Sequence, residues 1–374
     1  MKAVILAAGR GTRTFPLTEN KPKCMLNVLN RPLLYYTLEK LKNLGIEEIG
    51  VVIGHKKEKI KEYFGKNFKY FRQKKLVGTA NALYQARNFI DGNFIALNSD
   101  VYFEDNLKNF LKFKKNTIGT IFSSNTGLYG RILKKGNKLI RIEEKSLGGK
   151  GMINSGIYLF DEKIFDFIEK TRENDSRKEY ELTDSINLMA RNFEFKTYNL
   201  EGYWQDITFP WDLLKANLFA LNKINDIVIG DNTEVWPSAI IRKPAVIGNN
   251  CTIKNCVIEA SVIGNYCTIG EFSVVKRSIV GDFSKVPHLN YVGDSIIGEN
   301  CNLGAGTKIA NLRFDEKEIL AIVKNQKVST GLKKFGAVIG DRAKTGINVS
   351  IYPGRIIGCN KWVKPHSEVI ENII

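Results

Sequence analysis

The sequence of 374 residues has no long hydrophobic run and contains only six cysteines and three histidines. No apolar stretch approaches the roughly 20 residues that a membrane-spanning helix needs. The apolar stretch at the N-terminus is too short and wrongly flanked for a signal peptide. We therefore expect a cytoplasmic protein with no membrane partner. The cysteines form no Cys-x-x-Cys pair and have no histidine at ligand spacing, which argues against disulfides and sulfur-bound metals.

The chain is strongly basic, with a formal net charge of +17. Such a charge can indicate nucleic-acid binding. Much of the excess, however, lies between His55 and Lys75, where lysines alternate with glutamates on an expected helix, so a solvated helix face is the favoured interpretation. We expect no nucleic-acid partner, because nucleotides, sugar phosphates or coenzyme A would suit the same positive field.

Apolar strands alternate with amphipathic helices in the first half of the chain. The pattern predicts strands over residues 3–8, 49–53 and 93–97, and helices over 32–44 and 80–89. This order is typical of right-handed βαβ units and a parallel sheet. Ligands of such sheets bind beyond the carboxyl ends of the strands, so the polar residues there should share one cleft.

A glycine-rich, basic loop follows the first strand directly. Gly9 and Gly11 allow a positive φ and bring bare N–H groups toward a ligand, and Arg10, Arg13 and Lys23 add positive charge. This pattern predicts a cradle for a polyphosphate. The loop lacks the Gly-Lys-Ser/Thr ending of a P-loop and the third glycine of a dinucleotide fingerprint. An ordinary strand turn with basic surface residues is the alternative.

The full string Leu-Ala-Ala-Gly-x-Gly-Thr-Arg, followed by Lys21-Pro22-Lys23, resembles the signature loop of the sugar-1-phosphate nucleotidylyltransferases. The resemblance implies catalytic roles for Arg13 and Lys23, which would stabilise the pyrophosphate and the pentacoordinate phosphorus. It also implies that the nucleotide is bound by a set of loop and strand residues: Leu6, Ala8, Gly9, Gly11 and Thr12.

Two aspartates are candidates for holding Mg²⁺. Asp100 directly follows a buried strand, and a carboxylate there can ligate the ion that neutralises the phosphates. Asp206 lies in a second string, from Trp204 to Asn217, that resembles the family's second signature; the resemblance implies that it shares the metal with Asp100. Thr208 stands where the family usually has glycine. The alternative for either aspartate is a turn or a helix cap.

Gln73, Gly78 and Thr79 have the spacing of the family's base-reading segment. By resemblance, the glutamine side chain and the glycine backbone would bind the base, and the spacing fits uridylyl- and thymidylyltransferases, hence UTP or dTTP. A surface glutamine before a helix capped by Thr79 is the alternative.

Three further strings resemble the sugar-binding elements of the family. They would place backbone, carboxylate, ammonium and amide groups around a sugar-1-phosphate. Each string alone would be ordinary strand-edge chemistry. The residues are Gly130, Glu143, Lys145 and Asn154.

From residue 223 the sequence becomes repetitive. An aliphatic residue followed by glycine recurs at spacings that are multiples of six, as from Ile229 to Ile247 and from Ile339 to Ile357. This period predicts a parallel β-helix with aliphatic ladders inside and glycine or asparagine at the turns; an irregular β-sandwich would not explain it. The period breaks over residues 281–294 and 311–334, where we expect functional loops.

His288 lies in the string Ser-Lys-x-x-His-Leu-x-Tyr-x-Gly-Asp. This string resembles the acetyltransferase half of the bifunctional N-acetylglucosamine-1-phosphate uridylyltransferase/glucosamine-1-phosphate acetyltransferases. Histidine suits a general base that takes a proton from an attacking amine. The resemblance implies roles for further residues: Asn311 at the acceptor site, the Ala305 N–H at the thioester oxyanion, and Lys276, Tyr291 and Lys334 at the sugar phosphate.

Together these resemblances imply a Rossmann-like nucleotidyltransferase domain with a mostly parallel sheet over residues 1–222 and a left-handed β-helix over 223–374. They imply a homotrimer, or a dimer of trimers. The function predicted is acetyl transfer from acetyl-CoA to glucosamine-1-phosphate and Mg²⁺-dependent coupling of the product to UTP. One alternative is an enzyme that is only a nucleotidylyltransferase and couples dTTP or UTP to glucose-1-phosphate. Its β-helix would then serve assembly only. Another is a catalytically inactive regulatory subunit.

Overall fold

The computed structural model describes residues 1–144, 148–174 and 178–374, and these residues form two compact units. The first unit comprises residues 1–10, 22–25 and 33–206, and the second comprises 11–21, 26–32 and 207–374. By compactness, therefore, the chain changes unit at Ile207, and two short N-terminal segments join the C-terminal part. The domain boundary predicted after residue 222 stays a prediction.

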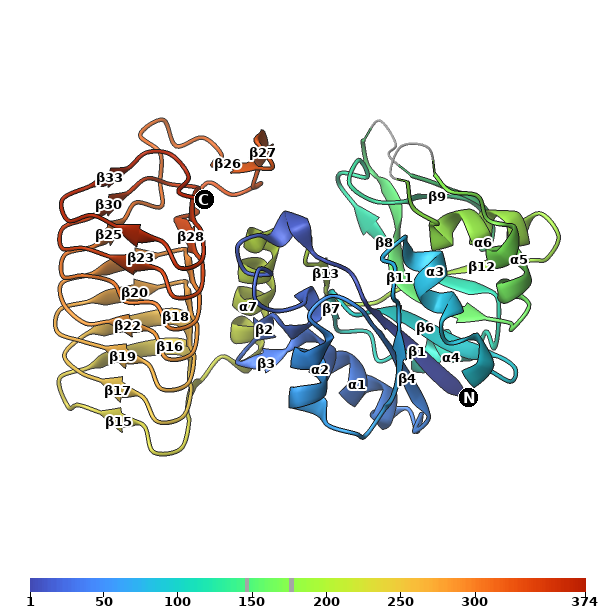
Figure 1. Ribbon diagram of the computed structural model, residues 1–374, viewed down its shortest axis with the longest axis horizontal. Coiled ribbons are helices and arrows are strands. Elements are labelled where there is room, and N and C mark those ends of the chain that lie inside the picture. Colours follow the sequence, from blue (N-terminus) through green and yellow to red (C-terminus); the bar gives the residue numbers. More distant parts are fainter. Residues whose placement is uncertain (145–147, 175–177) are drawn as a thin grey trace. The chain divides into compact units, whose positions relative to one another are not determined.

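The first unit is built on one mixed sheet with strand order β5-β4-β1-β6-β11-β8-β12-β10-β9 (Figure 1). The strands β5, β4, β1 and β6 are parallel, as the βαβ pattern predicts, whereas β11 runs antiparallel to β6 and β8. The strand bounds are β1 Lys2–Ala7, β4 Ile49–Ile53, β5 Lys69–Arg72, β6 Phe94–Asn98, β8 Thr117–Ser123, β9 Arg131–Lys135, β10 Lys138–Glu143, β11 Gly151–Phe160 and β12 Lys196–Asn199.

Helices cover both faces of this sheet and bury their apolar sides against it. One core gathers α1, α2 and α4, and the other gathers α3, α5 and α6. Strand β1 alternates between the two, because Ala3 and Ile5 point to the first core and Val4 and Leu6 to the second. The helix bounds are α1 Leu33–Asn43, α2 Lys57–Phe64, α3 Thr79–Tyr84, α4 Lys108–Leu111, α5 Ile164–Lys170 and α6 Leu182–Ala190.

The basic segment between His55 and Lys75 does not form one helix. Helix α2 ends at Phe64 with Gly65 as its C-cap, and the chain then forms the edge strand β5. The interpretation as a single helix was wrong because Gly65, at a φ of 65°, reverses the chain halfway through the segment. The lysines and glutamates of α2 do lie on a solvated face, since only Ile60 of that helix is buried.

The second unit contains a parallel β-helix in which successive coils stack strand upon strand (Figure 1). A first face carries β14 Ile227–Ile229, β21 Ile279–Val280, β24 Ile296–Ile297, β28 Ala337–Ile339 and β31 Arg355–Ile357. A second face carries β15 Glu234–Val235, β17 Thr252–Ile253, β19 Thr268–Ile269, β22 Lys285–Val286, β29 Lys344–Thr345 and β32 Trp362–Val363. A third carries β20 Val274–Lys276, β23 Tyr291–Gly293, β25 Lys308–Ile309, β30 Ser350–Ile351 and β33 Glu368–Val369. The longer strands β16 Ile240–Ile247 and β18 Val257–Ile263 pair on both the third and the first face.

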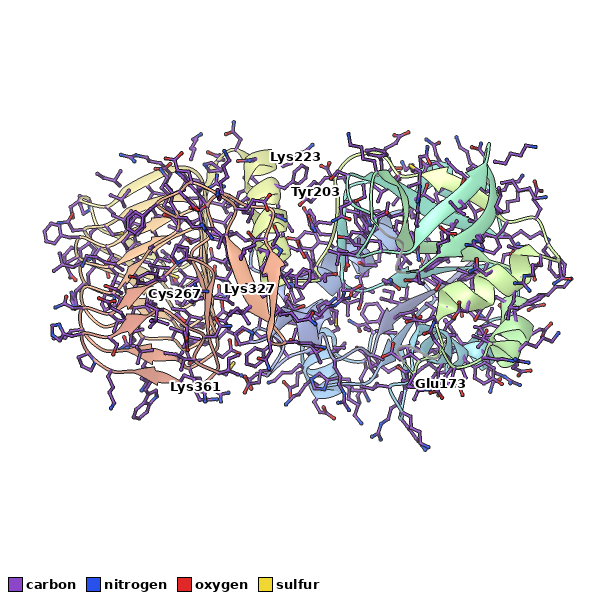
Figure 2. All side chains as sticks on the ribbon, turned by 90° about the horizontal axis from the view of Figure 1, so that it is seen from above. Glu173, Tyr203, Lys223, Cys267, Lys327 and Lys361 are labelled. Carbon is purple, nitrogen blue, oxygen red and sulfur yellow. The ribbon has the colours of Figure 1, made fainter. Side chains whose placement is uncertain are left out.

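The aliphatic residues of the six-residue period fill the interior of the coils. Ile247, Ile339 and Ile357 are almost fully buried, which confirms the predicted ladders, whereas Ile229 is 43% exposed because it lies in the first coil, at the end of the stack. All six cysteines are buried free thiols. Cys267, labelled in Figure 2, lies inside the coils, where its hydrogen bond with Cys251 and its burial both raise the pKa of its thiol.

Helix α7 (Pro210–Ile224) packs on the first face of the β-helix. Leu221 joins Val246 and Val262 in a small apolar cluster, and Asn217 accepts a hydrogen bond from Leu29 N over 2.9 Å. This contact holds the small hairpin β2 (Asn27–Val28) and β3 (Arg31–Pro32). Asp212, in the second signature, accepts a hydrogen bond from Phe209 N over 2.8 Å and so stabilises the start of α7.

The two predicted breaks of the period differ. Residues 281–294 form a regular coil that carries β22 and β23, so the loop expected there was wrong: this coil, like the one before it, spans 17 residues, one fewer than three hexapeptides. Residues 311–334 do leave the coil and form the hairpin β26 (Leu320–Val323) and β27 (Gln326–Ser329), which carries Lys327 (Figure 2). In the part of the chain that the structure describes, no helix is long and apolar enough to cross a membrane.

Candidate active sites

The glycine-rich loop follows β1 and passes from the first unit to the second between Arg10 and Gly11. Its tip is exposed at Gly9, Thr12 and Arg13. Gly11 has a φ of +63°, as predicted, whereas Gly9 does not adopt a positive φ. The strand end is fixed from both sides, since Leu6 O accepts from Ser99 N over 3.2 Å and Ala8 O accepts from His55 N over 3.0 Å.

Arg13 and its neighbours contact the start of α7 within the second unit. The Arg13 guanidinium lies 6.0 Å from the centre of the Phe209 ring, within the range of a cation–π contact. The Thr14 hydroxyl donates to Thr208 O over 3.0 Å. Thr208, where the family usually has glycine, has no positive φ, so the substitution leaves the local turn unstrained.

The two candidate metal ligands lie on one short antiparallel ladder in the first unit. Strand β13 (Trp204–Asp206) pairs with β7 (Val101–Phe103), and Asp206 is opposite Val101, the residue after Asp100. This register brings the two aspartates close together at one end of the ladder. Lys23 Nζ lies 2.7 Å from Asp100 Oδ2, with 13% and 28% of the two side chains exposed.

This pair of carboxylates fits a Mg²⁺ ion better than a transition metal. Mg²⁺ takes one or two protein carboxylates and completes its shell with phosphate oxygens and water. The described residues contain no cluster of three or more His, Cys, Asp or Glu side chains that would form a complete protein cage. Asp100 is partly exposed and pairs with the ammonium of Lys23, so its carboxylate is ionised and can ligate such an ion.

Gln73 is buried, not exposed. Its Nε2 donates to Gly78 O and to Asn81 Oδ1, each over 3.0 Å. These bonds hold the Gln73 amide against the start of α3, beside the other residues of the predicted base-reading segment. Gly78 has a φ of +113°, and a Cβ there would lie 2.4 Å from Tyr180 O. Thr79 begins α3 but caps a different helix, since Leu182 N donates to its hydroxyl over 2.9 Å. The alternative of a surface glutamine was therefore wrong.

In the predicted sugar-binding segment, the pairing of β9 with β10 makes the adjacent side chains of Glu143 and Glu144 point to different neighbours. A Cβ on Gly130 would lie 2.7 Å from Glu144 Oε1, so Glu144, not Glu143, faces the glycine. The Glu143 carboxylate instead pairs with Arg141. The sequence favoured Glu143 because a string without strand register cannot say which of two adjacent side chains points to which face. Lys145 lies outside the described residues.

Asn154 supports an irregularity in β11. Its Oδ1 accepts from Gly156 N over 2.9 Å and its Nδ2 donates to Tyr158 Oη over 2.8 Å, while Asn154 N donates to Gly130 O over 2.9 Å. The pairing of β11 with β8 shifts between Asn154 and Tyr158. Burial raises the pKa of the Tyr158 hydroxyl, so it stays a neutral partner of the amide. These contacts bring Gly130, Glu144 and Asn154 together.

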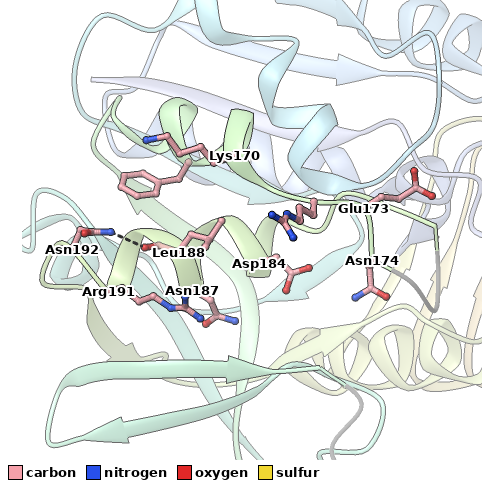
Figure 3. Close-up of a pocket in the computed structure, with 10 residues that line it drawn as sticks. Lys170, Glu173, Asn174, Asp184, Asn187, Leu188, Arg191 and Asn192 are labelled. Carbon is pink, nitrogen blue, oxygen red and sulfur yellow. Dashed lines mark hydrogen bonds between the residues drawn. The ribbon is translucent and has the colours of Figure 1, made fainter.

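Two open pockets lie near α6 but hold none of the predicted catalytic residues. The larger, of about 730 Å³, is lined by α5, α6 and the segment between them, including Lys170, Arg172 and Asp184 (Figure 3). The smaller, of about 440 Å³, shares Asn187 and Arg191 with it and contains Glu143. Glu143 therefore faces a depression on the α6 side of the sheet.

In the β-helix, His288 has a carboxylate partner that the sequence did not indicate. His288 Nδ1 lies 2.9 Å from Glu271 Oε2, and Lys254 Nζ lies 3.2 Å from the other oxygen of that carboxylate. Backbone hydrogen bonding, together with Lys254, keeps the pKa of Glu271 below its ordinary value, so this carboxylate remains ionised. An ionised partner at Nδ1 orients the ring and leaves Nε2 to accept a proton. His288 O accepts from Gly306 N over 3.0 Å, which places His288 beside Ala305.

The predicted sugar-phosphate residues gather around Gly293. A Cβ at this glycine would lie 2.8 Å from both Tyr291 Oη and Asn311 Nδ2, and Lys276 is its register partner on the neighbouring coil. Asn311 Nδ2 donates to the buried Asp294 Oδ2 over 2.6 Å.

Both predicted lysines of this site lie beside these residues. Lys276 Nζ is paired with Glu259 over 2.8 Å. Lys334 is exposed next to Phe335, whose N–H donates to Asn311 O over 2.9 Å. The predicted sugar-phosphate residues thus lie close to one another, on the same stack of coils that carries His288 and Ala305.

Both parts of the chain match known protein families. Residues 2–223 match the nucleotidyl transferase family, and residues 223–326 match the GMPPB C-terminal domain. The chain is 39% identical to bifunctional protein GlmU of Methanocaldococcus jannaschii, over 97% of this chain and 93% of that protein. It is 36% identical to the bifunctional sugar-1-phosphate nucleotidylyltransferase/acetyltransferase of Sulfurisphaera tokodaii, over 100% and 98%. The chain belongs to this bifunctional family.

Solved structures match the nucleotidylyltransferase part of this bifunctional enzyme. A Bacillus anthracis protein assigned as a glucose-1-phosphate thymidylyltransferase aligns with a TM-score of 0.55 and 27% identity, over 59% of this chain and 95% of that one. UDP-glucose pyrophosphorylase complexed with UDP-glucose aligns with a TM-score of 0.55 at 21% identity, over 59% and 98%. The second likeness shows the fold alone.

Sequence reasoning did not single out three residues that contact the predicted ones: Glu144, Glu271 and Asp294. Each lies against one of the predicted residues across neighbouring strands or coils. The spacing of 17 residues between Glu271 and His288, and between Asp294 and Asn311, equals one turn of the coil and could have revealed the last two.

Proposed function

We propose that this enzyme acetylates glucosamine-1-phosphate with acetyl-CoA and then couples the N-acetylglucosamine-1-phosphate to UTP, giving UDP-N-acetylglucosamine and pyrophosphate. The observation that carries the proposal is that one chain holds two separate constellations. One is the Asp100–Asp206 ladder with Lys23, and the other is His288 with Glu271 beside Ala305.

For nucleotidyl transfer, an oxygen of the sugar-1-phosphate attacks the α-phosphorus of UTP in line, and the bond to the leaving pyrophosphate breaks. Asp100 and Asp206 would hold Mg²⁺, which supplies charge neutralisation for the triphosphate. Lys23 and Arg13 bind the anionic oxygens on which charge develops. The bare N–H groups of Gly9, Gly11 and Thr12 orient the triphosphate, with Leu6 and Ala8 behind it.

The base and the sugar are bound by the two segments described above. Gln73 and Gly78, with Thr79 beside them, offer amide and backbone groups to a uracil or thymine edge, so UTP or dTTP is the nucleotide. On the sugar side we propose Glu144 as the carboxylate that binds hydroxyls, in the role first expected of Glu143, because it faces Gly130.

For acetyl transfer, His288 Nε2 takes a proton from the amine of glucosamine-1-phosphate as the nitrogen attacks the thioester carbon. The C–S bond then breaks, and coenzyme A leaves as the thiol. The Ala305 N–H stabilises the oxyanion of the tetrahedral intermediate. Asn311, Tyr291, Lys276 and Lys334 bind the acceptor and its phosphate.

We further propose a homotrimer, or a dimer of such trimers, assembled through the β-helix. Tyr266 and Phe283 support it: they stack at 4.8 Å on adjacent coils while remaining 52% and 49% exposed, an apolar corner that a neighbouring subunit would cover. Light scattering after size exclusion tests this, and a monomeric mass would contradict it.

Two release assays test the function. Acetyl-CoA with glucosamine-1-phosphate should release thiol, and UTP with N-acetylglucosamine-1-phosphate and Mg²⁺ should release pyrophosphate. His288→Ala should abolish only the first and Asp206→Asn only the second. Pyrophosphate release with glucose-1-phosphate and no thiol release with any amino-sugar phosphate would instead favour a nucleotidylyltransferase whose β-helix serves assembly only.

A further inference from the structure

Each coil of the β-helix turns from its first to its second face directly after a glycine. The residues that follow these glycines form one row up the corner, here named the corner row. In most coils the backbone N–H of one member donates to the side-chain oxygen of the next, as in Asn249 N to Asn265 Oδ1 over 2.9 Å and Asn265 N to Asp282 Oδ1 over 2.8 Å. The members of the corner row are Asp231, Asn249, Asn265, Asp282, Glu299, Asp341 and Cys359.

The last three members of the corner row contact the glycine-rich loop within the second unit. Lys21 forms an ion pair with Glu299. Asn20 Nδ2 donates to Asp341 Oδ2 over 3.1 Å. Cys359 Sγ lies 3.5 Å from Pro16 O, where it donates a weak hydrogen bond. Residues 16–21 therefore lie along the corner of three successive coils.

The residue types in the row change where the loop docks. The four members that precede Glu299 in the corner row are all Asn or Asp, whose short side chains reach the neighbouring coil. Glu299 carries one more methylene and pairs with Lys21. Asp341 does both: its Oδ1 accepts from Glu299 N over 2.9 Å and its Oδ2 accepts from Asn20. Cys359 ends the row with a thiol that cannot accept strongly.

These contacts fix one end of the loop, and α7 fixes the other. The Thr14 hydroxyl donates to Thr208 O over 3.0 Å and Arg13 lies against the Phe209 ring, so the Arg13 turn is anchored at the start of α7 directly before the segment that lies along the corner row, within the same compact unit. Lys21 and Glu299 are only 17% and 35% exposed, so their pairing is shielded from solvent more than a surface pair is.

From this geometry we propose that Glu299 and Asp341 are positioning residues for nucleotidyl transfer. They hold the loop in the register that presents Arg13 to the triphosphate. The β-helix then contributes to both reactions: it carries the acetyl-transfer residues and sets the rate of the other reaction. This inference rests on the proposed nucleotidyl transfer.

The test uses the full-length enzyme and both release assays. Glu299→Lys places two cations together, and it should lower kcat for pyrophosphate release by about 10-fold or more, since a misplacement of about 1 Å can cost about 100-fold. The KM for the sugar phosphate and the rate of thiol release should stay within about 2-fold of wild type. The double variant Lys21→Glu/Glu299→Lys restores the pair and should recover most of kcat.

Matched variants separate positioning from general damage. Asn249→Ala removes a corner-row hydrogen bond far from the loop, and Asp226→Ala breaks an exposed ion pair with Lys243 of 2.7 Å; neither should change pyrophosphate release. Asp341→Ala should lower kcat for pyrophosphate release as Glu299→Lys does. Because it also removes the acceptor of Glu299 N, thiol release by the same variant shows whether the β-helix remains folded.

An unchanged kcat in Glu299→Lys and Asp341→Ala would overturn the inference alone. So would equal losses in both assays, or no recovery in the double variant. A wild-type enzyme that releases no pyrophosphate would refute the proposed function itself, and this inference with it.

Discussion

Removing Lys23 should have opposite effects on turnover and on metal affinity. Lys23 Nζ lies 2.7 Å from Asp100 Oδ2, with 13% and 28% of the side chains exposed, so the pair is neither fully solvated nor dry. Two unit charges about 4 Å apart attract by about 4 kcal/mol at an effective dielectric constant of about 20. Under the proposed mechanism, Lys23 competes with a divalent ion for Asp100 in the free enzyme and binds the phosphates in the transition state.

Lys23→Ala should thus lower kcat for pyrophosphate release by about 100- to 1,000-fold, the usual cost of losing one electrostatic donor. The Mg²⁺ concentration at half-saturation should also fall. If about a third of the attraction is recovered, about 1.4 kcal/mol, that fall is about tenfold. Magnesium titrations of initial rate measure both quantities.

If the half-saturating Mg²⁺ concentration of Lys23→Ala rises or stays the same, the idea that Lys23 and the ion share Asp100 is refuted. Lys115→Ala is the matched control, because it breaks an ion pair of 3.4 Å with Asp161 elsewhere in the same unit. It should leave both quantities unchanged.

Three further predictions concern other parts of the molecule. Glu271→Gln should lower thiol release by about 10-fold, because the ionised partner that orients the His288 ring is lost. Gly78→Ala should lower the free energy of unfolding by more than about 1–3 kcal/mol in urea titrations, since its φ is +113° and the new Cβ meets opposing backbone at 2.4 Å. The hydrogen bond from Lys276 lowers the pKa of Glu259 from 4.5, so this pair stabilises the fold above that pH and loses its effect as pH falls through the lowered value. The destabilisation by Lys276→Met should accordingly be larger at about pH 7 than at about pH 3.

Elements with a clear period could be predicted from the sequence. Strand β4 was predicted with its observed bounds, and α1 within one residue at each end, because buried strands and amphipathic helices leave regular apolar patterns. The coils of the β-helix could be predicted from the recurrence of Ile or Val before glycine. The hairpin β26–β27 was anticipated only as an interruption, since an insertion reveals its place but not its form.

Contacts between distant segments could not be predicted. The antiparallel half of the sheet depends on β11, whose irregularity between Asn154 and Tyr158 is a matter of register. The choice between Glu143 and Glu144 depends on the pairing of β9 with β10. The docking of residues 16–21 on the corner row joins positions more than 270 apart along the chain, as in Lys21 and Glu299. None of these leaves a local pattern.

The central claim is that one chain performs two consecutive transfers. The most direct measurement is mass spectrometry of the products formed from glucosamine-1-phosphate, acetyl-CoA, UTP and Mg²⁺ by the purified enzyme alone. We predict UDP-N-acetylglucosamine together with equal amounts of free thiol and pyrophosphate. Formation of the nucleotide sugar only when N-acetylglucosamine-1-phosphate is supplied ready-made would contradict the account.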